Sequence, residues 1–331
     1  MAIKYGFIGS GFAAMHLEAL QQIPDTQLTA VCSRNEAAAQ TLIGDTGARY
    51  YTFENYLEML QKEQLDAVYI CVPPHLHGDL ERACAEHVKG LLIEKPIALN
   101  LELATSLQTT FEQAGTIVSV GYMNRYRQNL IDARNYFSTH APILINGAWS
   151  DELPPPYWWR RREMSGGQLT EQATHILDAI RYIAGETEEV NAYATSGFID
   201  NVEDFNVDDA MVMNLRLKNG AIGTVQTSCF THDHGGGALG IYLDMASREH
   251  TYRFRNHQMD LQIQGPDHAV TAQDSTDHAL LLENQAFINA LQTGNTEGIL
   301  SPYRDAIETL KISLAADISI AEKRSVSIAG L

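Results

Sequence analysis

The stretch "LLIEKPIALN", residues 91–100, places charged side chains directly after an apolar run. A buried strand needs its apolar residues, but it has no structural need for Glu94 and Lys95 at its end. One interpretation is a solvated charge pair, with Pro96 stopping further strand pairing. The other interpretation is chemical, since a cation at Lys95 can stabilise an alkoxide as a hydroxyl is oxidised, or polarise a carbonyl as it is reduced.

A second candidate for chemistry is a histidine in the middle of the chain. On a helix that begins near Thr170, the residues Glu171, His175, Asp178 and Tyr182 share one face, at spacings of four, three and four. A histidine flanked by carboxylates is suited to proton transfer near neutral pH. The alternative is a surface pair without a chemical role. The packed stripe of the same helix consists of Ala173, Ile176, Leu177 and Ile180.

The third candidate is a glycine-rich segment near the start of the chain. Residues 9–14, "GSGFAA", have the G-x-G-x-x-A form and directly follow a strand-like run at residues 3–8. The first glycine allows a tight turn, the second lets the backbone approach a pyrophosphate, and the final small residue permits close helix packing. The helix N-terminus offers free N–H groups to the phosphates. This strand–turn–helix context predicts a dinucleotide site that includes Gly9, Ser10, Gly11, Phe12 and Ala13.

The end of the second predicted strand should determine which dinucleotide is bound. Ser33 and Arg34 stand where an NAD-selective site usually has an acid. A hydroxyl and a guanidinium suit a 2′-phosphate, because arginine binds such oxygens in a bidentate way. An arginine in solution at a strand end is the alternative. The pair favours NADP(H) over NAD(H).

A proline pair marks a further part of the predicted cofactor site. In "CVPPHLHGDL", Pro73 and Pro74 end a strand and turn the chain over the carboxyl edge of the sheet, where ligands bind. His77 either faces the cofactor or lies on the surface at a helix start. We assign Pro73 and His77 to the cofactor site.

The stretch "PPPYWWRRR", residues 154–162, has two interpretations. Trp158 and Trp159 offer a face for a sugar ring, with residues 160–162 binding an acidic group. The same residues suit a subunit contact, where tryptophan and arginine are enriched. We assign Trp158 and Trp159 to the substrate site.

The elements that must position these residues fall into two groups. Strand-like runs and helical segments alternate up to residue 122, which predicts βαβ units and a parallel sheet. The strands are expected at residues 3–8, 27–33, 65–72, 91–93 and 116–122, and the helices at 12–22, 35–43, 76–88 and 101–113. Residues 1–122 therefore form a doubly wound dinucleotide-binding domain.

The second half of the chain has a different pattern. Consecutive strands are expected over residues 187–265, and Asn219-Gly220 is a strong hairpin signal between two of them. Helices are expected near residues 278–292 and 303–321. Residues 123–331 thus form an α+β domain with a large, mostly antiparallel sheet, for substrate binding and oligomerisation. The fold class is α/β, with a Rossmann domain first.

Composition excludes several classes of partner. The chain of 331 residues has 41 acids against 23 bases, so a nucleic acid is not expected to bind. No apolar run approaches the length that spans a bilayer. His232 and His234 have a spacing that could suit a metal, but no further ligand is apparent, so no metal site is expected. The four cysteines lack Cys-x-x-Cys spacing, which favours a reducing compartment, the cytoplasm.

Taken together, the motifs resemble the Gfo/Idh/MocA oxidoreductases, the family of glucose–fructose oxidoreductase and inositol dehydrogenase. The resemblance covers nearly the whole chain and is carried by "GFIGSGFAAMH", "YICVPPHLHGDL", "EKPIALN", "VGYMNRY" and "SGGQLTEQATHILDAIRYIAGE". It implies that Lys95 and His175 are catalytic and also contact the substrate. Glu171, which we also assign to the catalytic residues, stands where the family usually has an aspartate, four residues before the histidine. Ala173 replaces a usual glycine.

The same motifs extend the predicted site. Glu94 is assigned to the cofactor site, and Asn124, in "VGYMNRY", to the substrate site. The resemblance also implies a cis Lys95–Pro96 bond, and a homodimer or homotetramer that forms through the face of the antiparallel sheet.

The function expected from these residues is that of an NADP(H)-linked oxidoreductase acting on a sugar, cyclic polyol or related carbonyl compound. His175 would exchange the hydroxyl proton while Lys95 holds the oxygen. A non-catalytic dinucleotide-binding regulator is an alternative, because a fold does not determine a function. The presence of both Lys95 and His175 argues against it. Nicotinamide-assisted glycoside cleavage, without net redox change, is a further alternative that product analysis would separate.

Overall fold

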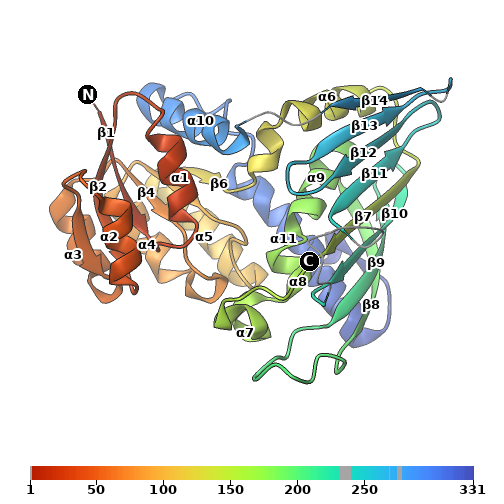
Figure 1. Cartoon of the computed structure of the whole chain (residues 1–331), viewed down its shortest axis with the longest axis horizontal. Helices are drawn as coiled ribbons and strands as arrows, with labels where there is room; N and C mark the ends of the chain where they lie inside the picture. The colour runs from red at the N-terminus through yellow and green to blue at the C-terminus, as the bar shows by residue number, and fades with distance from the viewer. Residues whose placement is uncertain (1, 231–239, 268, 274–277) are drawn as a thin grey trace. The chain divides into compact units, whose positions relative to one another are not determined.

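The structure, a computed structural model, describes residues 2–230, 240–267, 269–273 and 278–331. The chain divides into two compact units (Figure 1). The first consists of Met1–Tyr126 and His278–Ile307, and the second of Arg127–Asp277 and Glu308–Leu331. His232 and His234 lie outside the described residues.

The first unit is built on a six-stranded parallel sheet in the order β3-β2-β1-β4-β5-β6. Its strands are β1 (Ile3–Ile8), β2 (Thr26–Ser33), β3 (Arg49–Thr52), β4 (Ala67–Ile70), β5 (Gly90–Ile93) and β6 (Ile117–Val120). Every residue of β4 and β5 is buried, as expected for strands covered on both faces. The direction of strand order reverses between β1 and β4, which is where ligands bind in such sheets.

The helices of the first unit connect these strands. They are α1 (Ala13–Leu20), α2 (Glu36–Ile43), α3 (Tyr56–Glu63), α4 (Asp79–His87), α5 (Leu101–Ala114) and α10 (Ala279–Thr293). Asn35 caps α2 by accepting a hydrogen bond from the N–H of Ala38 at 3.0 Å. Asn100 caps α5 in the same way. These caps explain why the two helices begin where the sequence predicts them.

Residues 278–307 join the first unit, although the sequence pattern assigned them to the second domain. Helix α10 packs against α1 (Figure 1). Phe287 and Ile288 are fully buried in the core of the parallel sheet, and Phe287 meets Tyr69 edge-on with ring centroids 5.7 Å apart. The boundary therefore differs from the predicted one because α10 buries its apolar side chains against the sheet of the first unit.

The second unit is built on a nine-stranded sheet in the order β14-β13-β12-β11-β7-β10-β9-β8-β15. The strands are β7 (Leu144–Ser150), β8 (Thr187–Thr195), β9 (Ala210–Leu217), β10 (Ile222–Ser228), β11 (Tyr242–Ala246), β12 (Thr251–Arg255), β13 (Asp260–Gln264), β14 (Val270–Gln273) and β15 (Val326–Ser327). Neighbours in the described residues pair antiparallel, except for β7 with β10. The predicted hairpin is confirmed: Gly220 has φ +91° between β9 and β10.

The remaining helices are α6 (Gln128–Phe137), α7 (Arg162–Ser165), α8 (Gln168–Glu171), α9 (Thr174–Ala184) and α11 (Tyr303–Glu322). Ile145 of β7, Ile176 of α9 and Met213 of β9 lie in one core, so this face of the sheet is covered. Strand residues alternate, and the opposite face exposes apolar side chains such as Val212 and Ile222.

The predicted fold class is confirmed. The elements that the sequence pattern missed include β3, α3, α6 and β7, and also the short α7 and β15. Among the described residues, none of the helices is both long and apolar enough to cross a membrane. A search of the same residues finds no group of three or more histidine, cysteine or acidic side chains that could hold a metal ion.

Candidate active site

The glycine-rich loop after β1 has the geometry that a dinucleotide requires. Gly9 has φ +96°, and an added Cβ would lie 2.1 Å from the carbonyl oxygen of Cys71. At Gly11 an added Cβ would meet no heavy atom within 4 Å, so the backbone there borders open space. Helix α1 follows without a side-chain cap at its N-terminus. The first N–H groups of α1 and the open backbone at Gly11 therefore fit a pyrophosphate.

A hydroxyl pair braces this loop. The Oγ atoms of Ser10 and Ser33 are 2.8 Å apart, and Ser33 Oγ also accepts from the N–H of Asn35 at 3.0 Å. Ser33 is buried, whereas Arg34 is exposed at the end of β2, with its guanidinium 4.5 Å from the centroid of the Phe53 ring. Ser33 thus ties β2 to the loop, and Arg34 is the member of the pair that remains accessible.

His77 is a buried residue, so it is not the surface histidine that one interpretation expected. Its Nδ1 is hydrogen-bonded to Glu81, whose other carboxylate oxygen accepts from the N–H of Gly78 at 2.5 Å. Together they form the start of α4, just after Pro73. Within the described part of the chain, His77 Nε2 is buried without a hydrogen-bond partner.

Lys95 is the second residue beyond the end of β5, and the Lys95–Pro96 peptide bond is cis, as the resemblance implies. Glu94, assigned from sequence to the cofactor site, directs its carboxylate to His16 of α1, with Oε1 3.0 Å from Nε2. Asn124 is buried in a 3₁₀ helix (Met123–Tyr126) that follows β6.

These predicted residues share one edge of the parallel sheet. Gly9 follows β1, Arg34 follows β2, Pro73 lies just beyond β4, Lys95 lies just beyond β5 and Asn124 lies beyond β6. In a parallel sheet all of these strand ends lie on the same side, the side on which α/β proteins bind their ligands. The structure of the first unit thus places the glycine-rich loop and Lys95 at a common edge.

In the second unit, a glycine turn and a glutamine position the segment that carries His175. Gly166 and Gly167 both have positive φ, +77° and +85°, which only glycine adopts without strain. The Nε2 of Gln168 then donates to the carbonyl oxygens of Ser228 at 2.5 Å and Trp149 at 3.3 Å. The start of α8 is therefore held on the ends of β7 and β10.

The imidazole of His175 stacks on an indole that the sequence pattern did not single out. The rings of Trp149 and His175 are 5.8 Å apart at an angle of 24°. Trp149 also meets His257 edge-on at 5.3 Å, and His257 Nε2 is 3.6 Å from a carboxylate oxygen of Asp151. Trp149 was missed because β7 was missed. The signal was the strand-like "LINGAWS" between Pro142 and the proline run that follows.

The helix expected from Thr170 onward is interrupted, so that prediction is wrong. Helix α8 ends at Glu171 and α9 begins at Thr174. The N–H of Ala173 bonds to the carbonyl of Gln168, one residue further back than in an α-helix. The predicted packed stripe is nevertheless fully buried on α9 and its first flanking residue: Ala173, Ile176, Leu177 and Ile180.

The break places Glu171 on α8 and His175 on α9, and the carboxylate of Glu171 is hydrogen-bonded to the indole of Trp159. Its Oε2 accepts from the indole N–H of Trp159 at 2.8 Å. Trp159 is 1% exposed and packs with Val207 and Cys229, so it is a core residue of the second unit. Asp178 is also buried and accepts from the hydroxyl of Thr309 at 3.0 Å.

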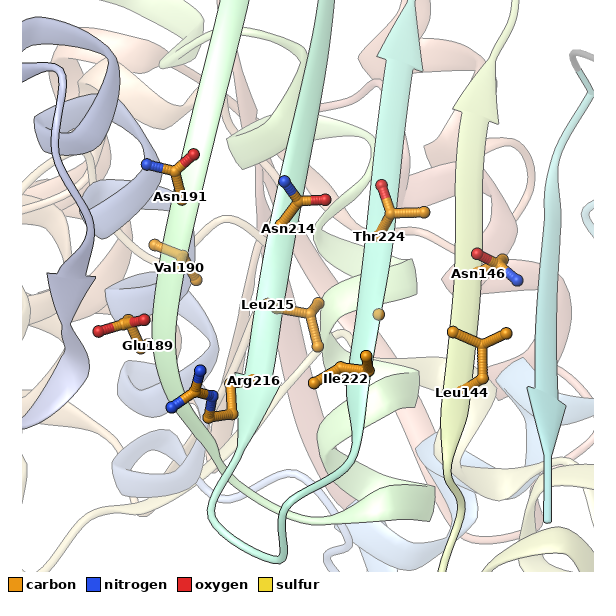
Figure 2. Close-up of a pocket in the computed structure, with 11 residues that line it drawn as sticks. Leu144, Asn146, Glu189, Val190, Asn191, Asn214, Leu215, Arg216, Ile222 and Thr224 are labelled. Atoms are coloured by element: carbon orange, nitrogen blue, oxygen red, sulfur yellow. The ribbon is translucent and has the colours of Figure 1, made fainter. Parts of the chain in front are cut away.

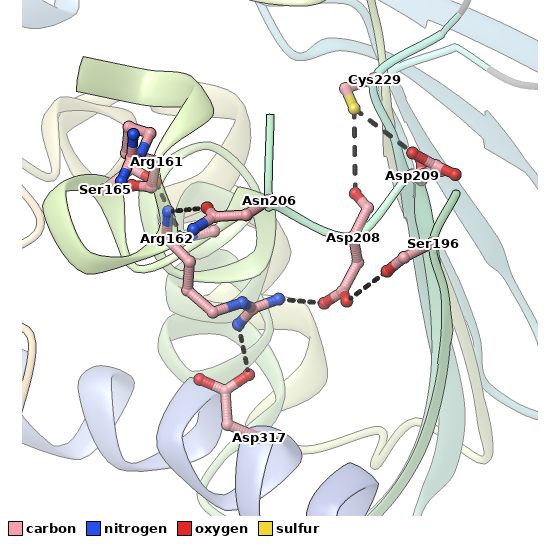
Figure 3. A network of polar contacts seen from close by, with 10 residues as sticks. Arg161, Arg162, Ser165, Ser196, Asn206, Asp208, Asp209, Cys229 and Asp317 are labelled. Carbon is pink, nitrogen blue, oxygen red and sulfur yellow. Dashed lines mark hydrogen bonds and ion pairs between the residues drawn. The ribbon is translucent and has the colours of Figure 1, made fainter. Parts of the chain in front are cut away.

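The arginines after the tryptophan pair form ion pairs within the second unit. Arg162 bridges Asp208 and Asp317, the latter at 3.2 Å (Figure 3). Arg161 pairs with Glu163 at 2.6 Å and with Asp204 at 3.4 Å. Burial raises the pKa of Asp317 to about 6, although Arg162 opposes the shift. These two arginines tie the loop before β9 to α7 and α11.

A hollow of about 390 Å³ lies on the open face of the large sheet (Figure 2). It is lined by side chains of β7, β8, β9 and β10, among them Leu144, Asn214, Arg216 and Ile222. Trp149 is on β7 as well, but five residues from Leu144 and therefore on the opposite face. The hollow is thus separated by the sheet from the residues around His175.

Comparisons with known proteins agree with this architecture. Residues 3–122 match a family described as "Oxidoreductase family, NAD-binding Rossmann fold", and residues 141–247 match the "GFO/IDH/MocA C-terminal domain". The chain is 27% identical to myo-inositol 2-dehydrogenase of Thermotoga maritima, over 98% of each protein. It is 26% identical to scyllo-inositol 2-dehydrogenase (NAD(+)) of Bacillus subtilis, over 89% of this chain and 86% of that protein.

A solved structure shows the same fold over the full length. It is a putative myo-inositol dehydrogenase from Sinorhizobium meliloti, with a TM-score of 0.81 and 24% identity, covering 99% of this chain and all of that one. The two family matches follow each other along the chain and correspond to its parallel and antiparallel sheets. The chain belongs to the Gfo/Idh/MocA family and is an NAD(P)-dependent oxidoreductase.

Proposed function

We propose that this oxidoreductase transfers a hydride between a nicotinamide cofactor and a carbon of a sugar, a cyclic polyol or a related carbonyl compound. The observation that carries the proposal is the position of Lys95 at the sheet edge that also bears the glycine-rich loop. The inositol dehydrogenases among the relatives support the substrate class.

The first unit binds the cofactor and holds the substrate oxygen. When bound, the nicotinamide ring accepts or donates the hydride. The backbone at Gly9 and Gly11, with the first N–H groups of α1, binds the pyrophosphate. Lys95 donates to the substrate oxygen and stabilises the negative charge that develops on it during oxidation. Asn124 contacts another hydroxyl group of the substrate, and Trp158, a residue of the second unit, contacts a further one.

The second unit moves the proton. His175 accepts the hydroxyl proton in oxidation and returns it in reduction. Trp149 supports one face of its ring, which limits the orientations that the imidazole can adopt. Glu171 orients and tunes the imidazole, and the indole N–H of Trp159 holds the carboxylate of Glu171 in place.

We propose NADP(H) as the preferred cofactor. Arg34 is exposed at the end of β2 beside the glycine-rich loop, and its guanidinium lies over Phe53. A guanidinium placed over an aromatic ring still has N–H groups to donate, which suits the 2′-phosphate of NADP(H).

We also propose that the chain forms a homo-oligomer in the cytoplasm. The open sheet face carries exposed apolar side chains, including Leu144, Val212 and Ile222, and a second copy of the chain would cover them. Ile222→Glu should therefore dissociate the oligomer. If this variant kept the oligomeric mass of the parent in solution, the proposed interface would be contradicted. The four cysteines are free and buried, and burial raises the pKa of each thiol, which is consistent with a reducing compartment.

The test of the proposed function is a spectrophotometric screen that follows the reduced nicotinamide band. Sugars and cyclic polyols are offered with NADP⁺ and with NAD⁺, and the corresponding carbonyl compounds with the reduced cofactors. Turnover that disappears in Lys95→Met supports the proposal. Dinucleotide binding without turnover of any member of these classes would contradict it, and product without net cofactor reduction would show glycoside cleavage instead.

A further inference from the structure

The carboxylate beside Lys95 is turned into the interior of the first unit. Glu94 is 5% exposed, and its backbone N–H pairs with the carbonyl of Ile70 at 2.9 Å. Its side chain packs against Gly121 so closely that an added Cβ there would lie 2.3 Å from Oε1. Its Oε2 accepts from the backbone N–H of Lys95 at 3.3 Å. Glu94 therefore holds the main chain at the residue whose side chain is proposed to be catalytic.

A fully buried histidine satisfies the other oxygen of this carboxylate. His16 of α1 places Nε2 3.0 Å from Glu94 Oε1. Its ring lies between Tyr69, with centroids 5.2 Å apart, and Phe12 of the glycine-rich loop, at 5.5 Å. His16 thus connects the Lys95 strand end with the loop that binds the pyrophosphate.

The contacts of Asn284 indicate which nitrogen of His16 carries the proton. The amide nitrogen of Asn284, on α10, donates to the carbonyl of Leu280 at 2.7 Å and lies 3.0 Å from His16 Nδ1. The amide oxygen is farther from Nδ1, at 3.3 Å. Nδ1 accepts from the amide, so the ring proton is on Nε2 and points at Glu94.

We propose that His16 and Asn284 are positioning residues that hold Glu94, and through it Lys95, in the geometry needed for hydride transfer. The proposal rests on the proposed function for its catalytic consequence. A buried carboxylate needs donors, because burial without them is unfavourable. Without the donor at His16, Oε1 of Glu94 is buried without a hydrogen bond from that side. The carboxylate can regain a donor only by moving, and Lys95 moves with it because its N–H is bonded to Oε2. Helix α10 follows the strands of the large sheet in the sequence but belongs to the first unit (Figure 1). Through Asn284 it thereby helps to position Lys95.

The test compares two replacements of His16 that differ in one property. His16→Gln keeps an N–H donor close to the position of Nε2, whereas His16→Leu fills a similar volume without a donor. The leucine variant should lose about 10- to 100-fold in kcat, the effect of one lost hydrogen bond to a charged group, while its Kd for NADPH changes less than about threefold. The glutamine variant should recover most of the lost turnover. Asn284→Leu should show a smaller loss in the same direction.

Hydrogen–deuterium exchange provides a readout that needs no substrate. In His16→Leu, peptides covering residues 91–100 should exchange about tenfold faster, whereas peptides of β2 should be unchanged. His87→Leu and Asn289→Leu, at exposed positions on α4 and α10, are the matched controls and should behave as the parent.

The outcomes separate this inference from the proposed function. Equal turnover losses in His16→Leu and His16→Gln, or unchanged exchange at residues 91–100, would overturn the positioning role. Loss of NADPH binding in His16→Leu would also overturn it, because the histidine would then serve the loop rather than Lys95. If the parent turns over no sugar or polyol, the proposed function is contradicted. The exchange comparison still shows whether His16 holds Glu94 and the main chain at Lys95. If His16→Leu does not fold, His16→Gln and Asn284→Leu carry the same comparison.

Discussion

The indole of Trp149 and the imidazole of His175 stack on each other, with centroids 5.8 Å apart and an angle of 24° between the rings. Trp149 lies near the carboxyl end of β7 and His175 in the first turn of α9. The proposed proton-transfer residue is thus supported by a strand of the sheet and not only by its own helix.

Removing this support should lower turnover. Trp149→Ala should reduce kcat about three- to tenfold, because an aromatic pair contributes about 0.5–1.5 kcal/mol beyond its buried area. Trp149→Phe, which keeps a ring under the imidazole, should retain most of the rate. Asn146→Ala, on the opposite face of the same strand, is the control. Parental kcat in Trp149→Ala would show that the stack has no catalytic role.

The two proposed catalytic residues should be separable from cofactor binding. Lys95→Met should keep the fold and the dinucleotide affinity but lose most turnover, and His175→Ala should lose about 10²- to 10⁴-fold, the range for a lost general acid–base. Lys89→Met is the matched control, since Lys89 stands at the opposite end of β5 and is exposed beside Asp66. Near-parental turnover in both catalytic variants would remove the mechanism. Lost cofactor binding in Lys95→Met alone would make the lysine a cofactor anchor.

Arg34 should determine the choice of cofactor. NADPH should bind more tightly than NADH, and Arg34→Ala should weaken NADPH about 10- to 100-fold, as expected for lost charge-assisted hydrogen bonds, with little effect on NADH. Arg49→Ala, an exposed arginine of the neighbouring strand β3 paired with Glu63, is the control. Equal affinities of the parent for the two cofactors, measured by fluorescence titration, would refute the preference.

Glu171 should matter less than His175. Glu171→Gln keeps an oxygen that can accept from the indole of Trp159, so the fold should persist, and kcat should fall about tenfold, which is less than in His175→Ala. Trp159→Phe removes the donor from a buried site and should lower stability by about 1.5–3 kcal/mol, measured by denaturant unfolding. A larger kcat loss in Glu171→Gln than in His175→Ala would reverse the proposed roles.

The buried carboxyl group of Asp317 should make stability depend on pH. Burial raises the pKa of Asp317 from 3.8 to about 6 in the folded protein, so between these values the folded state binds more protons than the unfolded state. This group's contribution to stability is therefore fully present below about pH 4 and is lost as the pH rises through 6. As the pH rises over this range, the melting temperature of Asp317→Asn should therefore rise relative to that of the parent, because the variant has no carboxyl group to titrate. A constant difference between the two would show that Asp317 titrates normally.

Much of the fold and of the proposed site could be predicted from the sequence because the signals are local. The glycine-rich loop, the strand just before Glu94 and Lys95, the Asn219-Gly220 hairpin and the buried stripe of α9 each depend on residues within a few positions of one another. The prediction of a continuous helix from Thr170 was wrong because the backbone departs from the regular helical pattern between α8 and α9.

Only the tertiary structure decided the contacts between distant residues. His16 and Asn284 are 268 positions apart, and nothing in either residue type shows that both are buried and meet, or that His16 also contacts Glu94. Strand β7 pairs in parallel with β10, far along the chain, and this pairing brings Trp149 to the covered face of the sheet. The sequence by itself determined the family, the parallel or mostly antiparallel character of the two sheets and the candidate catalytic residues, because periodicity and motifs act over short spans. Which side chains support those residues was decided by packing, because burial depends on all the elements that meet at one place.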